Sequence, residues 1–486
     1  MQTVSCPSCG APVQFRSHAS VMAVCEFCRA AVLKDADDVK DIGKISSVLE
    51  DFSPIQMQAA GVFGGRNFTV VGRIQLRYEQ GMWNEWYLLF DDASASWLGD
   101  SSGLYTITTA REVAGPLPCF TDLTPGSQVQ VGGEPFTVAE KREAECIGGQ
   151  GELPFRVGDG WRIRVADLRR SASFVTLDYT DGEVPVVYNG MAVTLAELKF
   201  QLLRDDEQIK ASAGKYRGKL DALDCPKCGS TINYLPGVTT NLVCPACSSQ
   251  LDAAGPEATV LAAGESVART LTTLQLGATA NIQGSVHTVI GAMVRVDDEG
   301  TEWTEYLLYS TKTSFFWLVE TSEGWSRASV MPAWPEGNFA QGDMPRLDKA
   351  TFRKLYDYTA TVKYAAGAFN WRVAAGDQVR VSEFENGTTK LAAEMTASEL
   401  TWSRSTPVPF DQLKAWFGAG IQGDGPAAAS GAGSAGSVRA TQMKFVWWIL
   451  GLNAVPLLAN FGASFWIVLI ALIALFYPAK YFQGES

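Results

Sequence analysis

Eight of the ten cysteines fall into two identical patterns, and this spacing constrains the fold more than any other feature of the sequence. Both patterns read C-x2-C-x15-C-x2-C, with the same offset between them at every position. The chain starts without a basic segment followed by an apolar one, so we expect no secretory signal and a reducing compartment. In that setting the pairs indicate thiolates on a metal rather than disulfides. The eight candidate ligands are Cys6, Cys9, Cys25, Cys28, Cys225, Cys228, Cys244 and Cys247.

Four soft thiolates on two Cys-x-x-Cys turns can surround one ion tetrahedrally, and a spacer of this length allows the hairpin that joins the turns. We therefore expect two zinc ribbons, over residues 1–40 and 222–252, each holding one zinc ion. Iron in the same four-thiolate geometry is the alternative. Four protein ligands leave no open position for a substrate, so the expected role of both metals is structural.

The register of the cysteine patterns continues into the sequence that follows them. FTVVG at 68–72 matches HTVIG at 287–291 at the same offset as the cysteines. Repeats of this length indicate a duplicated architecture. We expect two copies, in which a β-rich domain over residues 50–215 or 265–418 follows each ribbon.

Both large domains are predicted to consist mainly of strands. Polar and apolar residues alternate in RIRV at 162–165 and QVRV at 378–381, which indicates strands with one buried face. Glycine-containing turns recur at short spacing, so the fold class is mainly β, with barrel-like or sandwich-like domains. GGRNFTV at 64–70 resembles GGEPFTV at 132–138, which suggests two similar β units within one copy. Few helices are expected, over 195–208, 210–221 and 409–417.

The composition changes after the second copy. Residues 419–442 are rich in Gly, Ala and Ser and predict a flexible linker. Residues 445–477 contain no charged side chain, and as one helix they would extend about 50 Å, against a hydrocarbon core of about 30 Å. We expect a transmembrane helical hairpin over 443–480. A single span beside an interfacial helix and a buried helix pair are the alternatives.

Basic residues flank the apolar segment on both sides. Arg439 and Lys444 precede it and Lys480 follows it. Because cytoplasmic loops carry the excess of Lys and Arg, both ends are expected on the cytoplasmic side of the inner membrane. Both ribbons and both β-rich domains would then lie in the cytoplasm.

The charge balance disfavours one class of partner. Lys and Arg number 40 and Asp and Glu number 52, which gives a net charge of −12. Nucleic-acid binding depends largely on neutralising phosphates, and neither ribbon carries a basic stripe. A zinc-ribbon nucleic-acid binder therefore remains only an alternative function.

A Trp-x-Glu-aromatic sequence occurs in both copies, with Trp83 and Glu85 in the first and Trp303 and Glu305 in the second. The aromatic residues could fill the core while the glutamate pairs with arginine, or the carboxylate could act as acid or base in an enzyme pocket. Phosphate-binding, nucleophile-elbow and dinucleotide motifs are absent from the sequence, so we expect no catalytic residues and keep the enzyme as an alternative. Three further reactive side chains are interpreted as packing residues: Cys119, Cys146 and His287.

These motifs resemble a bacterial family known as domain of unknown function 4178. The resemblance implies two tandem copies, each preceded by a ribbon, with no assigned activity and a setting in membrane-associated stress responses. The second copy ends with Glu394 followed by Trp402 and Ser403, and the first copy has no clear match to this ending. In the first copy the resemblance rests on 68–72, 83–89, 97–98 and 151–155, and in the second on 287–291, 303–308, 367–373, 391–394 and 399–403.

The functional expectation combines these features. We predict a non-enzymatic, membrane-tethered cytoplasmic scaffold or binding protein, with two structural zinc ions. Its expected partners are the membrane, through the C-terminal segment, and other proteins.

Overall fold

A computed structural model gives the fold of two long parts of the chain. It describes residues 2–205 apart from 18, 29, 36–37, 45–52, 80, 102 and 158–159. It also describes residues 221–421 apart from 235–240, 253–258, 263–272, 311–313, 338–341, 343 and 419–420. The expected transmembrane hairpin lies outside these residues, as does the expected linker except for residue 421. No helix among the described residues has the length and apolar character needed to cross a bilayer.

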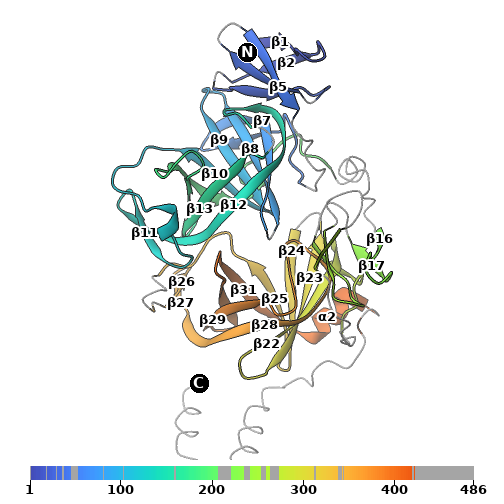
Figure 1. Cartoon of the computed structure of the whole chain (residues 1–486). Helices are drawn as coiled ribbons and strands as arrows, with labels where there is room; N and C mark the ends of the chain where they lie inside the picture. Colours follow the sequence, from blue (N-terminus) through green and yellow to red (C-terminus); the bar gives the residue numbers. More distant parts are fainter. Residues whose placement is uncertain are drawn as a thin grey trace, which may run out of the picture. The chain divides into compact units, whose positions relative to one another are not determined.

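Eight antiparallel strands of the first copy form a closed ring, which we call the first barrel (Figure 1). Four strands form one meander and four form a second, and the pairings β7–β12 and β10–β15 close the ring. The first meander is β7 (Arg66–Arg77), β8 (Met82–Phe90), β9 (Ala95–Ser101) and β10 (Leu104–Ala110). The second is β12 (Glu134–Leu153), β13 (Arg162–Arg170), β14 (Ser173–Asp178) and β15 (Val186–Val193).

The second copy repeats this arrangement as the second barrel. The pairings β22–β28 and β25–β31 close its ring, so barrels rather than sandwiches form in both copies. Its first meander is β22 (Ser285–Val296), β23 (Glu302–Ser310), β24 (Ser314–Thr321) and β25 (Gly324–Val330). Its second is β28 (Arg353–Phe369), β29 (Gln378–Asn386), β30 (Thr389–Met395) and β31 (Leu400–Val408).

Each meander begins with the same hairpin, so each barrel contains two similar β units. The short strands β6 (Ala60–Phe63), β11 (Gln128–Val131), β21 (Thr279–Ile282) and β26 (Arg346–Leu347) lead into two-residue turns. Both residues of every turn have positive φ, the type I′ geometry that matches the twist of paired strands. Strand β27 (Ala350–Thr351) follows the last turn. Asp348 and Lys349 form that turn without glycine.

Paired glycines form the seam between the two meanders. Gly72 on β7 faces Gly151 on β12, and Gly291 on β22 faces Gly367 on β28. A Cβ atom at Gly72 would lie 1.9 Å from the backbone oxygen of Glu152. The strands approach too closely at this point for any side chain, so the glycines are required for closure.

The ribbons extend the sheets of the barrels. In the first ribbon, β1 (Gln2–Ser5) pairs with β2 (Pro12–Phe15), and β3 (Met22–Val24) pairs with both β4 (Ala30–Asp35) and β12. Strand β5 (Asp38–Lys44) pairs with β4. In the second ribbon, β16 (Asp221–Asp224) pairs with β17 (Thr231–Tyr234), and β18 (Asn241–Val243) pairs with both β19 (Gln250–Asp252) and β28. Strand β20 (Thr259–Ala262) pairs with β19. Each ribbon is therefore hydrogen-bonded to the long strand of the barrel that follows it.

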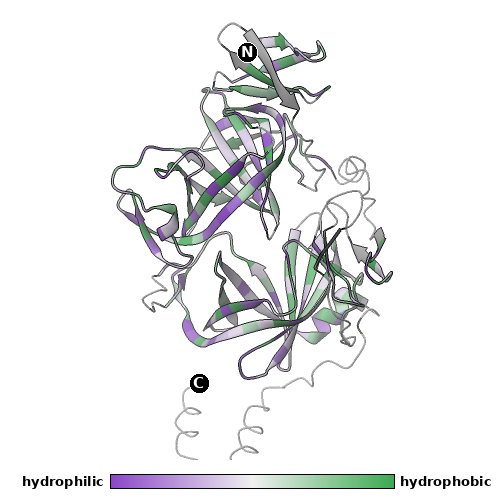
Figure 2. Cartoon of the chain, in the orientation of Figure 1, coloured by the Kyte–Doolittle hydropathy of each residue, from purple (hydrophilic) through white to green (hydrophobic). Residues whose placement is uncertain are grey.

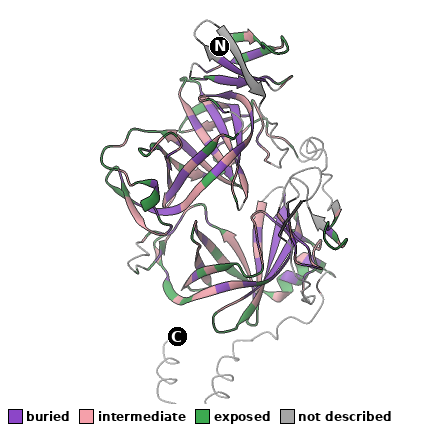
Figure 3. Cartoon of the chain, in the orientation of Figure 1, coloured by how far each residue is buried: buried purple, intermediate pink, exposed green. Residues whose placement is uncertain are grey.

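Burial alternates along β9, whereas consecutive residues are buried along β7 and β22. Hydrophobic and hydrophilic residues alternate along the barrel strands (Figure 2), and most strand positions are buried or intermediate (Figure 3). The largest fully buried side chains include Trp86 and Phe68 in the first barrel and Tyr306 and Trp402 in the second.

The helix predictions have different outcomes. The helix over 409–417 is confirmed as α2 (Phe410–Phe417), and a 3-10 turn, η1, covers Phe120–Asp122. The helix over 195–208 is wrong as far as residue 205, because that segment is turn and irregular structure. Lys199 and Leu202 have positive φ, and Gln201 forms a β-bridge to Ala60, which a helix could not do. The helix over 210–221 lies outside the described residues, except that Asp221 begins β16.

Candidate functional site

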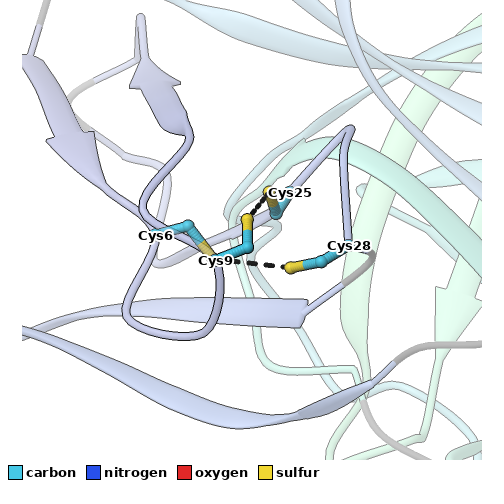
Figure 4. Close-up of side chains that lie close together, drawn as sticks. All are labelled: Cys6, Cys9, Cys25 and Cys28. Carbon is cyan, nitrogen blue, oxygen red and sulfur yellow. Dashed lines mark hydrogen bonds between the residues drawn. The ribbon is translucent and has the colours of Figure 1, made fainter.

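The four cysteines of the first ribbon converge on one point (Figure 4). Cys6 Sγ lies 3.6 Å from Cys28 Sγ, and Cys9 Sγ lies 3.7 Å from Cys25 Sγ. All four sulfur atoms lie within 4.8 Å of one another. One thiol of each Cys-x-x-Cys turn therefore meets a thiol of the other turn.

The second ribbon repeats this geometry. Cys225 Sγ lies 3.8 Å from Cys247 Sγ, and Cys228 Sγ lies 3.7 Å from Cys244 Sγ. Zinc–sulfur bonds of about 2.3 Å in a tetrahedron place neighbouring sulfurs about 3.8 Å apart. Each group thus fits one zinc ion. Four thiolates would hold each ion, which would cross-link the two Cys-x-x-Cys turns of its ribbon. Four cysteines leave no position for a reacting molecule.

Backbone hydrogen bonds build the turns that present the thiols. In the first turn of each ribbon, the N–H of Gly10 or Gly229 donates to the carbonyl of Cys6 or Cys225 over 2.8 Å. Gly10 has a φ of 77°, and Gly229 has a φ of 74°. Only glycine adopts this conformation at low cost, which accounts for the Cys-Gly step in both motifs.

Local hydrogen bonds favour thiolates at the turns. Bonds from the hydroxyl and the backbone N–H of Ser230 lower the pKa of Cys228 to about 6. In the first ribbon, the backbone N–H of Ala30 lowers the pKa of Cys28 to about 7. The pKa shifts differ within each ribbon, since neighbouring thiols and burial raise the pKa of Cys9 to about 12, and burial raises that of Cys244 to about 12. The thiolate is the form that binds a metal, so a metal would have to displace protons from these two thiols.

The conserved spacing of Trp and Glu in the two copies produces the same contact in both barrels. Trp83 Nε1 donates a hydrogen bond of 2.8 Å to Glu85 Oε1, and Trp303 Nε1 donates one of 2.7 Å to Glu305 Oε1. Neither glutamate is a surface group, since Glu305 is 9% exposed and Glu85 is partly buried. The interpretation that the aromatic residues pack is correct, while the carboxylates lie inside with them.

Further charged residues surround Glu85 in the first barrel. Burial raises the pKa of Glu85 to about 7; Trp83 and the charge of Arg142 oppose the rise, and Asp167 and Asp178 add to it. Strand β8, which carries Glu85, lies opposite β14, which carries Asp178, in the ring. The charges of these two side chains therefore interact across the interior of the barrel, here called the lumen. Arg142 Nη2 lies 2.5 Å from Asp167 Oδ2.

The second barrel has a matching cluster with the arginine on a different strand. Arg295 Nη1 lies 3.5 Å from Glu305 Oε1 and 3.0 Å from Glu394 Oε1. Burial raises the pKa of Glu305, and the charge of Arg295 opposes the rise. Tyr358 donates a 2.7 Å hydrogen bond to Glu383.

Strand registers show which positions correspond. The tryptophan of the Trp-x-Glu sequence pairs with Leu76 in the first barrel and with Arg295 in the second. The first barrel therefore has leucine at the position of Arg295. Val165 and Val381 occupy equivalent positions, and they pair with Arg142 and Tyr358 respectively. The second barrel therefore has tyrosine at the position of Arg142. Arg142 in the first barrel and Arg295 in the second both contact carboxylates, but only Arg295 lies within ion-pair distance of the Trp-x-Glu glutamate.

Sequence reasoning identified the glutamates but missed their neighbours. Val165 pairs with Asp178, and the equivalent Val381 pairs with Glu394. Asp178 is therefore the counterpart of Glu394, which the sequence comparison did not find in the first copy. The alternation in strands β13 and β14 was the signal available. It showed that polar side chains share one face, without showing which strands face one another.

The three packing residues have mixed outcomes. His287 is buried and its ring packs edge-on against Phe316, with centroids 5.2 Å apart. Cys146 is buried, as expected. Cys119 is exposed, so its assignment to the core is wrong. It lies at the start of η1, where Phe120 rather than the cysteine enters the core.

Two segments of the chain, residues 56–194 and 275–410, match the family described as a domain of unknown function (DUF4178). Each match follows one four-cysteine group, and the two together cover more than half of the chain. Comparison with curated proteins gives no match.

Proposed function

This chain belongs to the DUF4178 family, and we propose that it is a membrane-tethered cytoplasmic scaffold or binding protein whose two ribbons are structural zinc sites. One observation supports the structural role above others. In both copies a ribbon strand pairs with the long barrel strand, β3 with β12 and β18 with β28. A metal at either four-thiol group would hold a ribbon that is itself part of a barrel sheet.

The proposed tether rests on the sequence of the tail. Residues 445–477 carry no charge, and basic residues flank them at both ends. A linker of about 24 residues has a reach of roughly 25–30 Å, which would keep both barrels near the bilayer and raise their effective concentration for membrane partners. The bacterial stress setting is part of this proposal and rests on the family resemblance alone.

Membrane fractionation tests the tether. The full chain is expected to sediment with membranes, and a chain lacking residues 443–486 is expected in the soluble fraction. The shortened chain should keep the metal content of the full chain, which shows that it is folded. If it still sediments with membranes while folded, the tether is wrong.

An enzyme remains the second candidate because of Glu85. A carboxyl group with a pKa near 7 is suited to general acid–base work at neutral pH. The two candidates differ in what Glu85→Gln would do. It would abolish the activity of an enzyme but leave the membrane association and protein partners of a scaffold unchanged.

A further inference from the structure

The two lumens differ in whether a positive charge lies next to the glutamate of the Trp-x-Glu sequence. Glu305 has Arg295 at 3.5 Å, a position that Leu76 occupies in the first barrel. In the first lumen the guanidinium of Arg142 is engaged by Asp167 at 2.5 Å and by Glu140 at 3.0 Å. Among the described residues, no cation lies within 4.0 Å of the Glu85 carboxylate.

The groups that face Glu85 come from four strands. Arg142 on β12 is the one cation among the groups that shift its pKa, and Asp167 on β13 and Asp178 on β14 are anions. Tyr188 on β15 is neutral, because burial raises its pKa to about 12. Carboxylates therefore outnumber cations in this lumen.

The residues that pair with Glu85 on the neighbouring strands β7 and β9 carry no charge. Ile74 on β7 pairs with Glu85 on one side, and Gly99 on β9 pairs with it on the other. A Cβ atom at Gly99 would lie 3.7 Å from both oxygens of the Glu85 carboxylate. In the second barrel, Val319 takes the place of this glycine opposite Glu305.

We propose that Glu85 is a proton-binding residue in the lumen of the first barrel, and that Glu305 of the second barrel binds a proton less readily because Arg295 lies within ion-pair distance of its carboxylate. A proton on Glu85 removes one of the excess negative charges that Arg142 cannot balance. As the pH rises past neutrality the proton leaves Glu85, and the first lumen becomes more negative. The first barrel thereby contains a pH-sensitive device.

Carboxyl resonances of the full chain test this proposal. With glutamate labelled at the carboxyl carbon, the Glu85 signal is the one lost in Glu85→Gln, and the Glu305 signal is the one lost in Glu305→Gln. We expect the Glu85 signal to titrate with a midpoint of about 7 and the Glu305 signal to titrate at a lower pH, because the adjacent Arg295 favours its ionised form. A Glu85 midpoint below about 5 would overturn proton binding at neutral pH, and equal midpoints would overturn the difference between the barrels.

A second variant keeps the carboxyl group and changes its surroundings. Leu76→Arg places a guanidinium where the second barrel has Arg295. The Glu85 midpoint should then fall by about 1–3 pH units, since an adjacent opposite charge favours the ionised form. An unchanged midpoint in a folded variant would show that the missing cation is not the cause. If either glutamine variant fails to fold, the signal shifted by Leu76→Arg in the otherwise native chain identifies Glu85.

Discussion

The carboxylate of Glu152 accepts a 2.9 Å hydrogen bond from the backbone N–H of Ser17, which links the first barrel directly to the loop of the first ribbon. The same oxygen accepts bonds from the N–H of Arg16 over 2.7 Å and from the hydroxyl of Ser20 over 2.9 Å. Glu152 is 2% exposed, so these three donors are satisfied by a group that water barely reaches. The corresponding position on β28 is Ala368, so the second ribbon is held without this carboxylate.

Replacing Glu152 with alanine is expected to destabilise the first copy. The change leaves buried donors without an acceptor, which costs about 1–3 kcal/mol. Urea unfolding measures the loss. The matched control is Glu145→Ala on the same strand, whose side chain is 46% exposed and whose contact with Arg162 is 3.6 Å long. Exposed pairs contribute little, so the control should change stability by less than about 1 kcal/mol. Equal losses in the two variants would contradict the proposed link.

Metal content should follow the cysteines one ribbon at a time. The full chain is expected to hold two zinc ions, and Cys25→Ser or Cys244→Ser should each reduce the content to one, because one lost thiolate opens a four-thiolate site. Elemental analysis of purified protein measures this. Cys119→Ser is the control, since Cys119 is exposed and outside both four-thiol groups, and it should keep two ions. Iron in place of zinc would revise the metal, and no metal at all would refute both sites.

The repeat and the thiol groups could be predicted because both are written locally in the sequence. Cys-x-x-Cys turns force two sulfurs together whatever surrounds them, and Gly10 and Gly229 mark the turns directly. Alternation identified the strands for a similar reason, since the residues of RIRV at 162–165 that alternate in polarity also alternate in burial. The hairpin similarity at 64–70 and 132–138 correctly indicated two β units, because type I′ turns restrict sequence strongly.

The lumen could not be predicted in the same way. Glu85 and Asp178 interact because ring closure brings opposite strands within reach, and no local pattern encodes which strands lie opposite. The false helix at 195–208 has a related cause. Its apolar residues Leu198 and Phe200 pack near Phe68 in an irregular segment that a barrel strand holds in place, so tertiary contacts override local helix propensity.

Alanine at Gly72 is expected to open the seam of the first barrel. The added Cβ atom would lie 1.9 Å from the backbone oxygen of Glu152, and backbone on both sides cannot move without breaking ladder hydrogen bonds. We expect a loss of about 3 kcal/mol or more in the free energy of unfolding, or failure to fold.

Gly182→Ala is the matched control for the seam. No atom lies within 4 Å of a Cβ placed at Gly182, and its φ is not positive. Its stability should stay within about 0.5 kcal/mol of the native chain or rise slightly, as replacing glycine restricts the unfolded chain. Thermal unfolding of both variants compares them. A native melting temperature for Gly72→Ala would show that the strands are further apart at the seam than the structure indicates.

Stability should fall as the pH rises towards neutrality, and Glu85 should account for part of the fall. Its pKa is raised by burial from an ordinary 4.5 to about 7, so the folded chain binds this proton more tightly than the unfolded chain. The resulting stabilisation is complete below about pH 4.5 and is lost as the pH passes about 7, with a magnitude of at most about 3 kcal/mol. Denaturant unfolding between about pH 5 and 8 should therefore show a flatter pH dependence for Glu85→Gln than for the native chain. Asp92→Asn is the control, because hydrogen bonds from Ser94 and Arg66 lower the pKa of Asp92 to about 2, below this window. It should keep the native slope, and a native slope in Glu85→Gln as well would show that Glu85 does not exchange its proton in this range.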